Sequence, residues 1–145
     1  GRVHRALDGA LEEAERAAYP CVHRFCRRVR LPPHVLELDE EHCLACVEMR
    51  QEQANPNGFA HGGFLFTIAD VTASALARAD GRDYATIDAD IHYLRNVKGG
   101  RIYGASALVR RGRTSVVADT SIRSEDGKEL ARVTVTMFCI APATE

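Results

Sequence analysis

An aspartate interrupts a segment that is otherwise almost wholly apolar. Asp70 lies in HGGFLFTIADVTASALA, residues 61–77, where apolar residues cover most of the circumference of a predicted helix. Such a helix is expected to be buried, and a buried carboxylate is costly unless it has a partner. Either Asp70 has a structural role, bonded to a hydroxyl one turn away at Thr67 or Ser74 or facing solvent through a gap, or the carboxylate serves as a base or a nucleophile.

The same predicted helix begins with two glycines that follow a histidine. In His61-Gly62-Gly63 the first backbone N–H groups of the helix lack intrahelical acceptors, so they favour negative charge. Glycine lets a ligand approach the backbone closely, although the two glycines could instead serve only the packing of the preceding loop. N–H donors for an oxyanion and a carboxylate are two components of an acyl-transfer site.

The spacing of these two components predicts an assembly of two chains. Gly62 and Asp70 are separated by about 12 Å along a helix axis, whereas a reacting carbonyl carbon must lie about 3 Å from both groups. Two helices running antiparallel about a two-fold axis would bring each helix start near the partner's acid, twice over. The sequence therefore predicts a homodimer with two composite sites.

These residues must be positioned by a sheet, which the sequence predicts around the helix. Alternation of apolar residues between turn signals indicates strands over 34–41, 43–50, 84–94, 101–110, 114–124 and 129–140. The long helix is predicted over 62–79 after an ordered loop over 51–63, and a first helix over 4–18 ends before Pro20. The last four strands are expected to form an antiparallel meander packed on the long helix, which makes an α+β domain.

The strand that follows the long helix carries acids on one face. In YATIDADIHYL its even-numbered polar residues alternate with Ile87, Ala89, Ile91 and Tyr93. Asp88, Asp90 and His92 are therefore expected on the opposite face of the sheet from this apolar set.

Composition and charge exclude several classes of protein. The 145 residues suit one domain, 46% of them are hydrophobic, and the formal net charge is −1. This charge offers no bulk attraction to nucleic acid or to an anionic membrane, and no apolar run approaches the roughly 20 residues of a membrane span. The N-terminal segment is charged and amphipathic, unlike a secretory signal, so a cytoplasmic protein is expected.

Five cysteines leave two interpretations open, free thiols or a metal site. Their odd number, without a secretory signal, disfavours a disulfide framework. Cys43 and Cys46 have the spacing of a zinc knuckle, and Cys21 and Cys26 could join them. Residues three apart in a strand point to opposite faces, however, so free, partly buried thiols and no metal are favoured.

A longer motif links the loop, the helix and the next strand. Asn55, Gly58, HGGFLFTIAD and TIDADIHYLRNVKGGRIYG follow one another with a spacing in which the chain resembles the hotdog-fold acyl-CoA thioesterases, specifically the phenylacetic-acid-degradation (PaaI-type) group. The resemblance covers about residues 34–140. It implies a hotdog domain over 34–145, an antiparallel sheet wrapped around a long central helix, with an N-terminal helix and connector over 1–33.

The resemblance also implies an activity and an assembly. The expected reaction is hydrolysis of an aryl-acyl (phenylacetyl-type) or medium-chain acyl-CoA to free acid and CoA, with no cofactor. The dimers of such enzymes usually pair into tetramers. Neither a nucleic-acid partner nor a membrane partner is expected.

Catalytic roles carry over from the resemblance to particular residues. Asp70 would be the general base for water or the nucleophile, and Gly62 of the partner chain would donate its N–H to the thioester oxygen. Asn55 would help position water or the carboxylate, and Thr86 would orient the water. His61 falls at the family's histidine, which more often holds the loop by hydrogen bonds than carries a proton.

Substrate contacts are expected along the helix and in basic turns. Gly63, Phe64 and Phe66 are expected to contact the substrate, and the acyl pocket would run along the helix, bounded by Phe64, Leu65, Phe66 and Ile68. The phosphates of CoA need cations, and several lie in predicted turns near strand ends: Arg95, Lys98, Arg110, Arg111 and Arg113. For each one of these cations, ordinary surface solubility is the alternative role.

Two other functions stay open. Related hotdog enzymes are hydro-lyases that act on enoyl or hydroxyacyl thioesters and pair a histidine with an acid, but His61 and Asp70 are about 13 Å apart along one helix. A non-catalytic acyl-CoA binding module would bind the thioester without turnover. The sequence has no Gly-x-Ser-x-Gly elbow, nucleotide-binding glycine loop or helix-turn-helix pattern that would favour another class.

Overall fold

One long helix lies at the centre of the structure. The computed structural model describes residues 33–142, so the predicted helix over 4–18 and the cysteines Cys21 and Cys26 lie outside the described residues. Helix α3 (Gly62–Arg78) matches the predicted helix closely, and most of its side chains are buried. The helix is followed by Gly81, whose φ of 83° suits glycine and turns the chain back toward the sheet.

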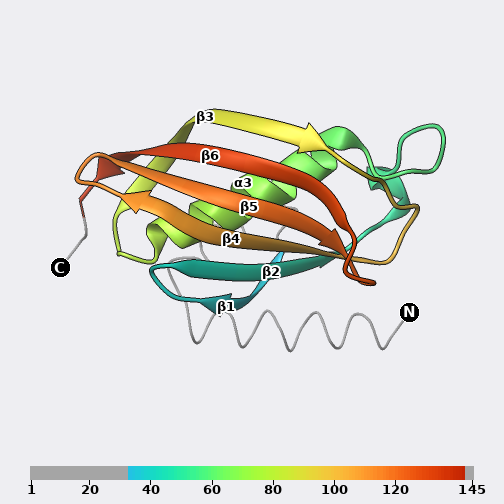
Figure 1. Cartoon of the computed structure of the whole chain (residues 1–145), viewed down its shortest axis with the longest axis horizontal. Coiled ribbons are helices and arrows are strands. Elements are labelled where there is room, and N and C mark those ends of the chain that lie inside the picture. The colour runs from blue at the N-terminus through green and yellow to red at the C-terminus, as the bar shows by residue number, and fades with distance from the viewer. Residues whose placement is uncertain (1–32, 143–145) are drawn as a thin grey trace.

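Six antiparallel strands form a single sheet against this helix (Figure 1). All six were predicted from alternation, and their ends differ from the predicted ones by a few residues at most. Their bounds are β1 (His34–Leu38), β2 (His42–Glu48), β3 (Asp83–Tyr93), β4 (Arg101–Arg111), β5 (Ser115–Ser124) and β6 (Glu129–Ala141). A short 3-10 helix, η1 (Gln51–Gln53), opens the loop that leads to α3.

The order of the strands corrects the predicted four-strand meander. The sheet runs β1-β2-β4-β5-β6-β3, so only β4, β5 and β6 form a meander, and β3 lies at the far edge beside β6. The connection after β3 therefore crosses the end of the sheet instead of making a hairpin (Figure 1). Its first N–H groups, of Leu94 and Arg95, donate to Leu130 O at 2.8 and 3.1 Å. Alternation predicts a strand but not its neighbour, which is why the sequence misplaced β3.

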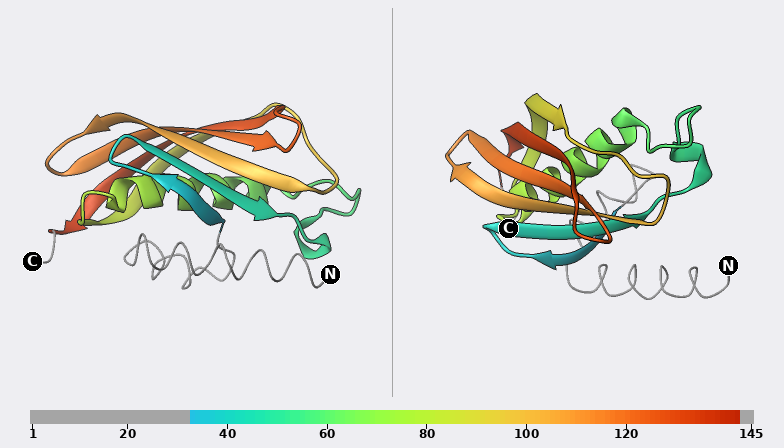
Figure 2. Two further views of the ribbon diagram at one scale, coloured as in Figure 1. Left: turned by 90° about the horizontal axis from the view of Figure 1, so that it is seen from below. Right: turned by 45° about the vertical axis from the view of Figure 1, so that its right-hand side comes forward.

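The sheet wraps one side of α3, and the core lies between them (Figure 2). The closest approach is at Gly104 of β4, where a Cβ atom would lie 2.5 Å from Thr72 Oγ1 and 3.2 Å from an Ile68 methyl carbon. Glycine is required there because any side chain would push the helix away from the sheet. Among the described residues, α3 is too short and not apolar enough to cross a lipid bilayer.

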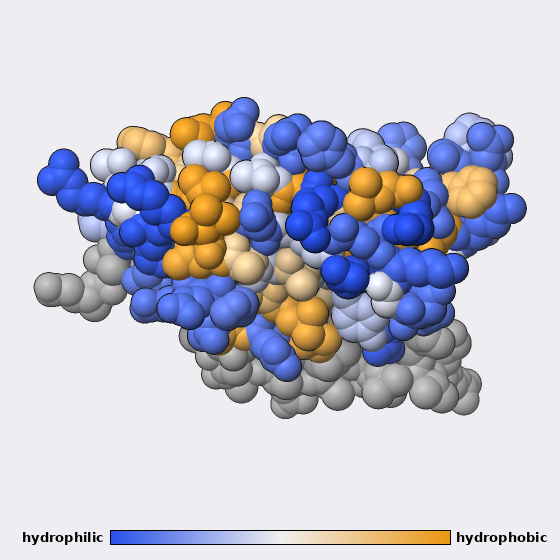
Figure 3. All heavy atoms as spheres, in the orientation of Figure 1, coloured by the Kyte–Doolittle hydropathy of each residue, from blue (hydrophilic) through white to orange (hydrophobic). Residues whose placement is uncertain are grey.

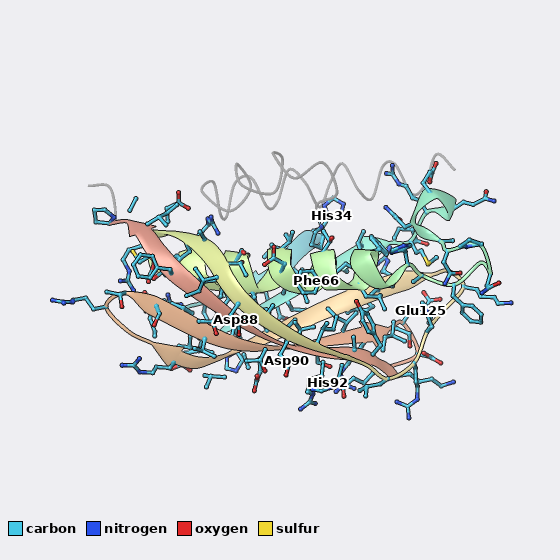
Figure 4. The ribbon with its side chains drawn as sticks, turned by 90° about the horizontal axis from the view of Figure 1, so that it is seen from above. His34, Phe66, Asp88, Asp90, His92 and Glu125 are labelled. Atoms are coloured by element: carbon cyan, nitrogen blue, oxygen red, sulfur yellow. The ribbon has the colours of Figure 1, made fainter. Side chains whose placement is uncertain are left out.

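The outer face of the sheet, away from α3, is mostly polar. In Figure 3 it shows mainly hydrophilic residues, with separate apolar patches. The exposed apolar side chains include Val109 of β4 and Phe138 and Ile140 of β6. Asp88, Asp90 and His92 of β3 point away from the helix (Figure 4), as their alternation predicted.

The C-terminal end of α3 is held by an arginine from the sheet. Arg111 Nη1 donates to Ala77 O at 2.8 Å, and its Nη2 donates to Leu76 O at 3.0 Å. Cations suit this position because the last carbonyls of a helix lack partners. Nη2 also donates to Glu40 O at 2.9 Å. Both terminal nitrogens of Arg111 are therefore engaged within the chain, and the expected contact between Arg111 and a substrate phosphate stays a prediction.

Asp80 is the anion of this cluster. One of its oxygens, Oδ2, accepts from Arg111 Nη1 at 2.6 Å, from Tyr84 Oη at 2.6 Å and from Arg82 Nε at 3.0 Å. Burial by itself would raise the pKa of the Asp80 carboxyl, but these hydrogen bonds hold it below its usual value. Burial and the bond to Asp80 raise the pKa of Tyr84 to about 12. The cluster is therefore ionised at Asp80 and neutral at Tyr84 near neutral pH.

We expect Asp80→Asn to lower the free energy of unfolding by about 2 kcal/mol at neutral pH, because Arg111 would lose its counterion in a site where the two side chains are only 15% and 11% exposed. The pKa of Asp80 is lower in the folded state than in the unfolded state. Asp80 therefore stabilises the fold at pH values above its unfolded pKa of about 3.9, and this stabilisation is lost as the pH falls through its folded pKa. Urea denaturation at a series of pH values measures both effects.

The control for this experiment is Asp90→Asn, which changes an aspartate whose side chain is 73% exposed on the outer face. It should change stability by less than about 0.5 kcal/mol. Equal losses in the two variants, or a difference between wild type and Asp80→Asn that persists in acid, would contradict the role given to Asp80.

Candidate active site

Asp70 lies in the third turn of α3, beside Thr86 of β3. Thr86 Oγ1 donates to Asp70 Oδ1 at 2.7 Å. Asp70 is partly exposed, so it reaches the surface through a gap, which is one of the alternatives that the sequence left open. Thr67, proposed as one alternative partner, instead donates to Gly63 O at 2.8 Å. The partner of the carboxylate in the described structure is therefore on the sheet and not on the helix.

A bulge in β3 puts Thr86 on the side of the sheet that faces Asp70. Thr86 pairs with Met137, whereas Asp88 pairs with Thr136, so Ile87 is an extra residue without a partner in β6. In a regular strand, residues two apart share a face, and Thr86 would lie on the outer face with Asp88. The bulge shifts this alternation by one residue, and the hydroxyl reaches the helix.

The bulge also changes the predicted apolar face of β3. Ala89 and Ile91 pack against the core as expected. Ile87, however, was predicted on the same face, and its side chain is 63% exposed because it occupies the bulge. Its place on the inner face is taken by Thr86, whose partner in β6 is the buried Met137.

The start of α3 leaves one backbone donor available. His61 caps the helix, and its Nδ1 accepts from Gly63 N at 3.0 Å. Phe64 N and Leu65 N both donate to His61 O. Within the described residues, the N–H of Gly62 alone among these first helical residues donates to no acceptor. This arrangement favours Gly62 over Gly63 as an oxyanion donor.

Tyr93 of β3 supports Gly62 and was missed by the sequence analysis as a site residue. Its hydroxyl donates to Gly62 O at 2.8 Å. A Cβ atom at Gly62 would lie 3.2 Å from the Tyr93 ring, so the ring covers the glycine closely. In the sequence, the one feature that pointed to Tyr93 as a site residue was its position on the apolar face of β3.

Asn55 organises the loop before the helix. Its Oδ1 accepts from Asn57 N at 3.0 Å and from Phe59 N at 3.1 Å, and its own N–H donates to Phe59 O at 2.7 Å. Asn55 and Asp70 form no hydrogen bond with each other in the described structure. The role expected for Asn55, positioning water or the carboxylate, therefore stays a prediction.

The two proposed chemical groups remain apart in one chain. Gly62 and Asp70 belong to the same unbroken helix, so they stay about 12 Å apart along its axis. The side chains between them on one stripe, Phe66 and Thr67, are partly exposed, as Asp70 is (Figure 4 labels Phe66). Phe64 is different: it lies in the core and is only 7% exposed, and its assignment as a pocket residue stays a prediction.

The cations predicted to meet phosphate separate into two groups. Arg95 and Lys98 lie in the β3–β4 connection, which contacts the start of α3 through a 2.8 Å hydrogen bond from Ala60 N to Val97 O. The second group surrounds the β4–β5 turn near the end of α3: Arg110, Arg111 and Arg113. Since α3 spans about 25 Å, one phosphate cannot meet both groups within one chain.

The cysteines offer no shared ligand set in the described structure. Cys43 and Cys46 are buried in β2, and Cys139 is partly buried in β6. Between residues 33 and 142, no three histidine, cysteine or acidic side chains lie together in a way that could hold a metal ion.

The cap geometry makes a prediction about His61. We expect His61→Ala to lower the free energy of unfolding by about 1 kcal/mol, because Gly63 N–H would lose its acceptor. His61→Asn should recover most of this loss, since asparagine is a good N-cap residue. Thermal or urea unfolding tests the pair; an asparagine variant as unstable as the alanine variant would show that the cap contributes little.

Comparison with known proteins adds a family to this geometry. Residues 57–131, about half of the chain, match the model of the Thioesterase superfamily. "Putative esterase ComA2" of Bacillus subtilis (strain 168) is 30% identical over 114 residues, which cover 76% of this chain and 84% of that protein.

Two solved structures are similar in fold and sequence. smu.793 from Streptococcus mutans UA159, bound to acetyl CoA, has 29% identity and a TM-score of 0.73, and the match covers 76% of this chain and 90% of that one. A hypothetical thioesterase protein from Streptococcus pneumoniae TIGR4, solved with coenzyme A, has 27% identity and the same TM-score, with coverage of 76% and 87%. With a six-stranded antiparallel sheet around one long helix, the chain belongs to the thioesterase superfamily and has its hotdog fold.

Proposed function

We propose that the protein hydrolyses acyl-CoA thioesters, with Asp70 as the reactive carboxylate. The observation that carries the proposal is the 2.7 Å hydrogen bond from Thr86 to Asp70 on the open stripe of α3. It orients one carboxylate oxygen and leaves the other for water or substrate. The Streptococcus mutans and Streptococcus pneumoniae proteins, which were solved with acetyl CoA and with coenzyme A, support this class of substrate.

The chemistry needs two chains. Asp70 takes a proton from water, the water oxygen attacks the thioester carbonyl, and the oxyanion that forms accepts the N–H of Gly62 from the partner chain. Collapse of this intermediate breaks the C–S bond and releases the acid, and the proton passes to the thiolate of CoA. Direct attack by Asp70 would instead give a mixed anhydride, which water then hydrolyses.

The exposed edge of the sheet supports the proposed dimer. β3 pairs with β6 on one side, and no strand of residues 33–142 lies on its other side. Ile87, Tyr93 and Leu94 expose apolar surface along or next to this edge. Edge strands of this length are usually protected from pairing with other chains. Pairing with β3 of a second copy would protect this edge. A dimer of such dimers, implied by the family resemblance, belongs to the same proposal.

The acyl group is proposed to be aryl, of the phenylacetyl type, or medium-chain. Phe66 supports this, because it is partly exposed one turn before Asp70 on the same stripe. The hydro-lyase alternative is less favoured, since the Nδ1 atom of His61 is engaged in capping the helix. A non-catalytic acyl-CoA binding module remains the second candidate function, and a turnover assay separates it from the first.

We expect Asp70→Asn to reduce kcat by a factor of about 1000 or more, because the variant lacks a base and a nucleophile. The loss of thioester absorbance, followed for phenylacetyl-CoA and a series of straight-chain acyl-CoAs, measures kcat without a thiol reagent that the cysteines would consume. Asp90→Asn, on the outer face, is the matched control and should keep wild-type turnover. Saturable acyl-CoA binding by wild type without turnover would favour the binding module instead.

Thr86 gives a second test of the same site. Thr86→Val should lower kcat by about tenfold, since the carboxylate loses an orienting hydrogen bond of about 1.5 kcal/mol. Thr86→Ser keeps a hydroxyl and should retain most of the activity. If serine and valine reduce kcat equally, the hydroxyl is not what matters at this position.

A further inference from the structure

An open pocket lies at the loop between β2 and α3, at the end of the molecule where that helix begins. Its volume is about 560 Å³, and its lining includes Met49, Arg50, Gln51, Asn55, Gly58 and Lys98. It contains neither Asp70 nor Gly62, so it lies outside the reacting centre proposed above. The pocket contributes two cations and two amide side chains but no carboxylate.

The walls of the pocket are preformed by hydrogen bonds between two loops. Ala60 N donates to Val97 O at 2.8 Å, and Asn96 Nδ2 donates to Ala60 O at 3.0 Å. Ala54 and Ala60 form an isolated β-bridge that closes the base of the first loop. A ligand would therefore meet an ordered surface and would not have to organise these loops.

The cation Lys98 is placed over the pocket by the loop. Its ammonium lies 4.9 Å from the centre of the Phe59 ring, and Phe59 is held by both its N–H and its carbonyl to Asn55. A cation over an aromatic ring keeps its charge and can still bind an anion. Asn55 thus places Lys98 through Phe59.

The second cation, Arg50, also has no carboxylate partner among the described residues. Neither Arg50 nor Lys98 forms an ion pair with any residue between 33 and 142. Arg50 Nα donates to Gln53 Oε1 at 2.6 Å, which fixes the backbone at the start of η1 and leaves the guanidinium exposed. Two cations without counterions over one pocket make a local positive site on a chain of net charge −1.

We infer that this pocket binds the phosphate-bearing end of the thioester's carrier group, with Arg50 and Lys98 as the phosphate ligands. Asn55 adds a neutral donor, because its Nδ2 donates to no atom of the described residues. The pocket borders the helix start, since Ala60, bonded to Val97, lies two residues before Gly62. The inference rests on the proposed function for the identity of the ligand, a thioester of coenzyme A or of phosphopantetheine.

The test is a binding measurement that needs no turnover. Isothermal titration calorimetry on the full chain would compare coenzyme A, 4′-phosphopantetheine and pantetheine, which carry successively fewer phosphates. We expect wild type to bind coenzyme A at least about tenfold more tightly than pantetheine. In the double variant Arg50→Gln/Lys98→Gln, this ratio of the two affinities should fall by a factor of about ten. Arg132→Gln/Lys128→Gln, which removes two exposed cations of β6 and its turn, is the matched control and should keep the ratio.

Each outcome decides the inference. Equal affinity of wild type for coenzyme A and pantetheine, no binding of coenzyme A, or equal ratios in the double variant and its control would overturn it. If 4′-phosphopantetheine binds as tightly as coenzyme A, the phosphate of the pantetheine arm is the group recognised; if it binds like pantetheine, the nucleotide end is. If the protein hydrolyses no thioester but the affinity ratio falls as expected in the double variant, the hydrolase proposal is wrong and the phosphate pocket is supported.

Discussion

The packing of α3 into the sheet is the constraint on which the candidate site depends. The sheet covers all but one stripe of the first half of the helix, and Gly104 lets β4 approach so closely that the helix cannot rotate without a clash at Thr72. Because the rotation of the helix is fixed, the residues on the open stripe are fixed too. Asp70 is on that stripe, and its distance from Gly62 follows from helix geometry alone.

The two ends of the helix have different roles. At the C-terminal end the carbonyl groups are occupied by Arg111, whose charge is balanced by Asp80, so that end is closed to ligands. At the N-terminal end His61 satisfies one N–H and leaves that of Gly62 available. This difference separates two arginines that looked equivalent in the sequence: Arg111 is structural, whereas the side chain of Arg113, two residues later, is exposed.

Local patterns were sufficient to predict the strands and the long helix, but not how these elements meet. Alternation marks each strand because one face of it is buried, and glycines mark the turns. The pairing of β3 with β6 depends on contacts between residues far apart in the chain, such as Thr86 with Met137, which no local pattern records. For the same reason the alternation did not reveal the bulge at Ile87, and only the motif resemblance suggested that Thr86 lies beside Asp70.

The bulge at Ile87 connects the site to the proposed dimer. An extra residue is tolerated best in a strand that pairs on one side only, and β3 is such a strand. At that edge the bulge does two things: it turns the Thr86 hydroxyl toward Asp70, and it leaves the Ile87 side chain exposed where a second chain would pack. The edge position of β3 therefore serves both the candidate site and the proposed dimer. The connection after β3, which crosses the end of the sheet and was not predicted from the sequence, gives β3 this position.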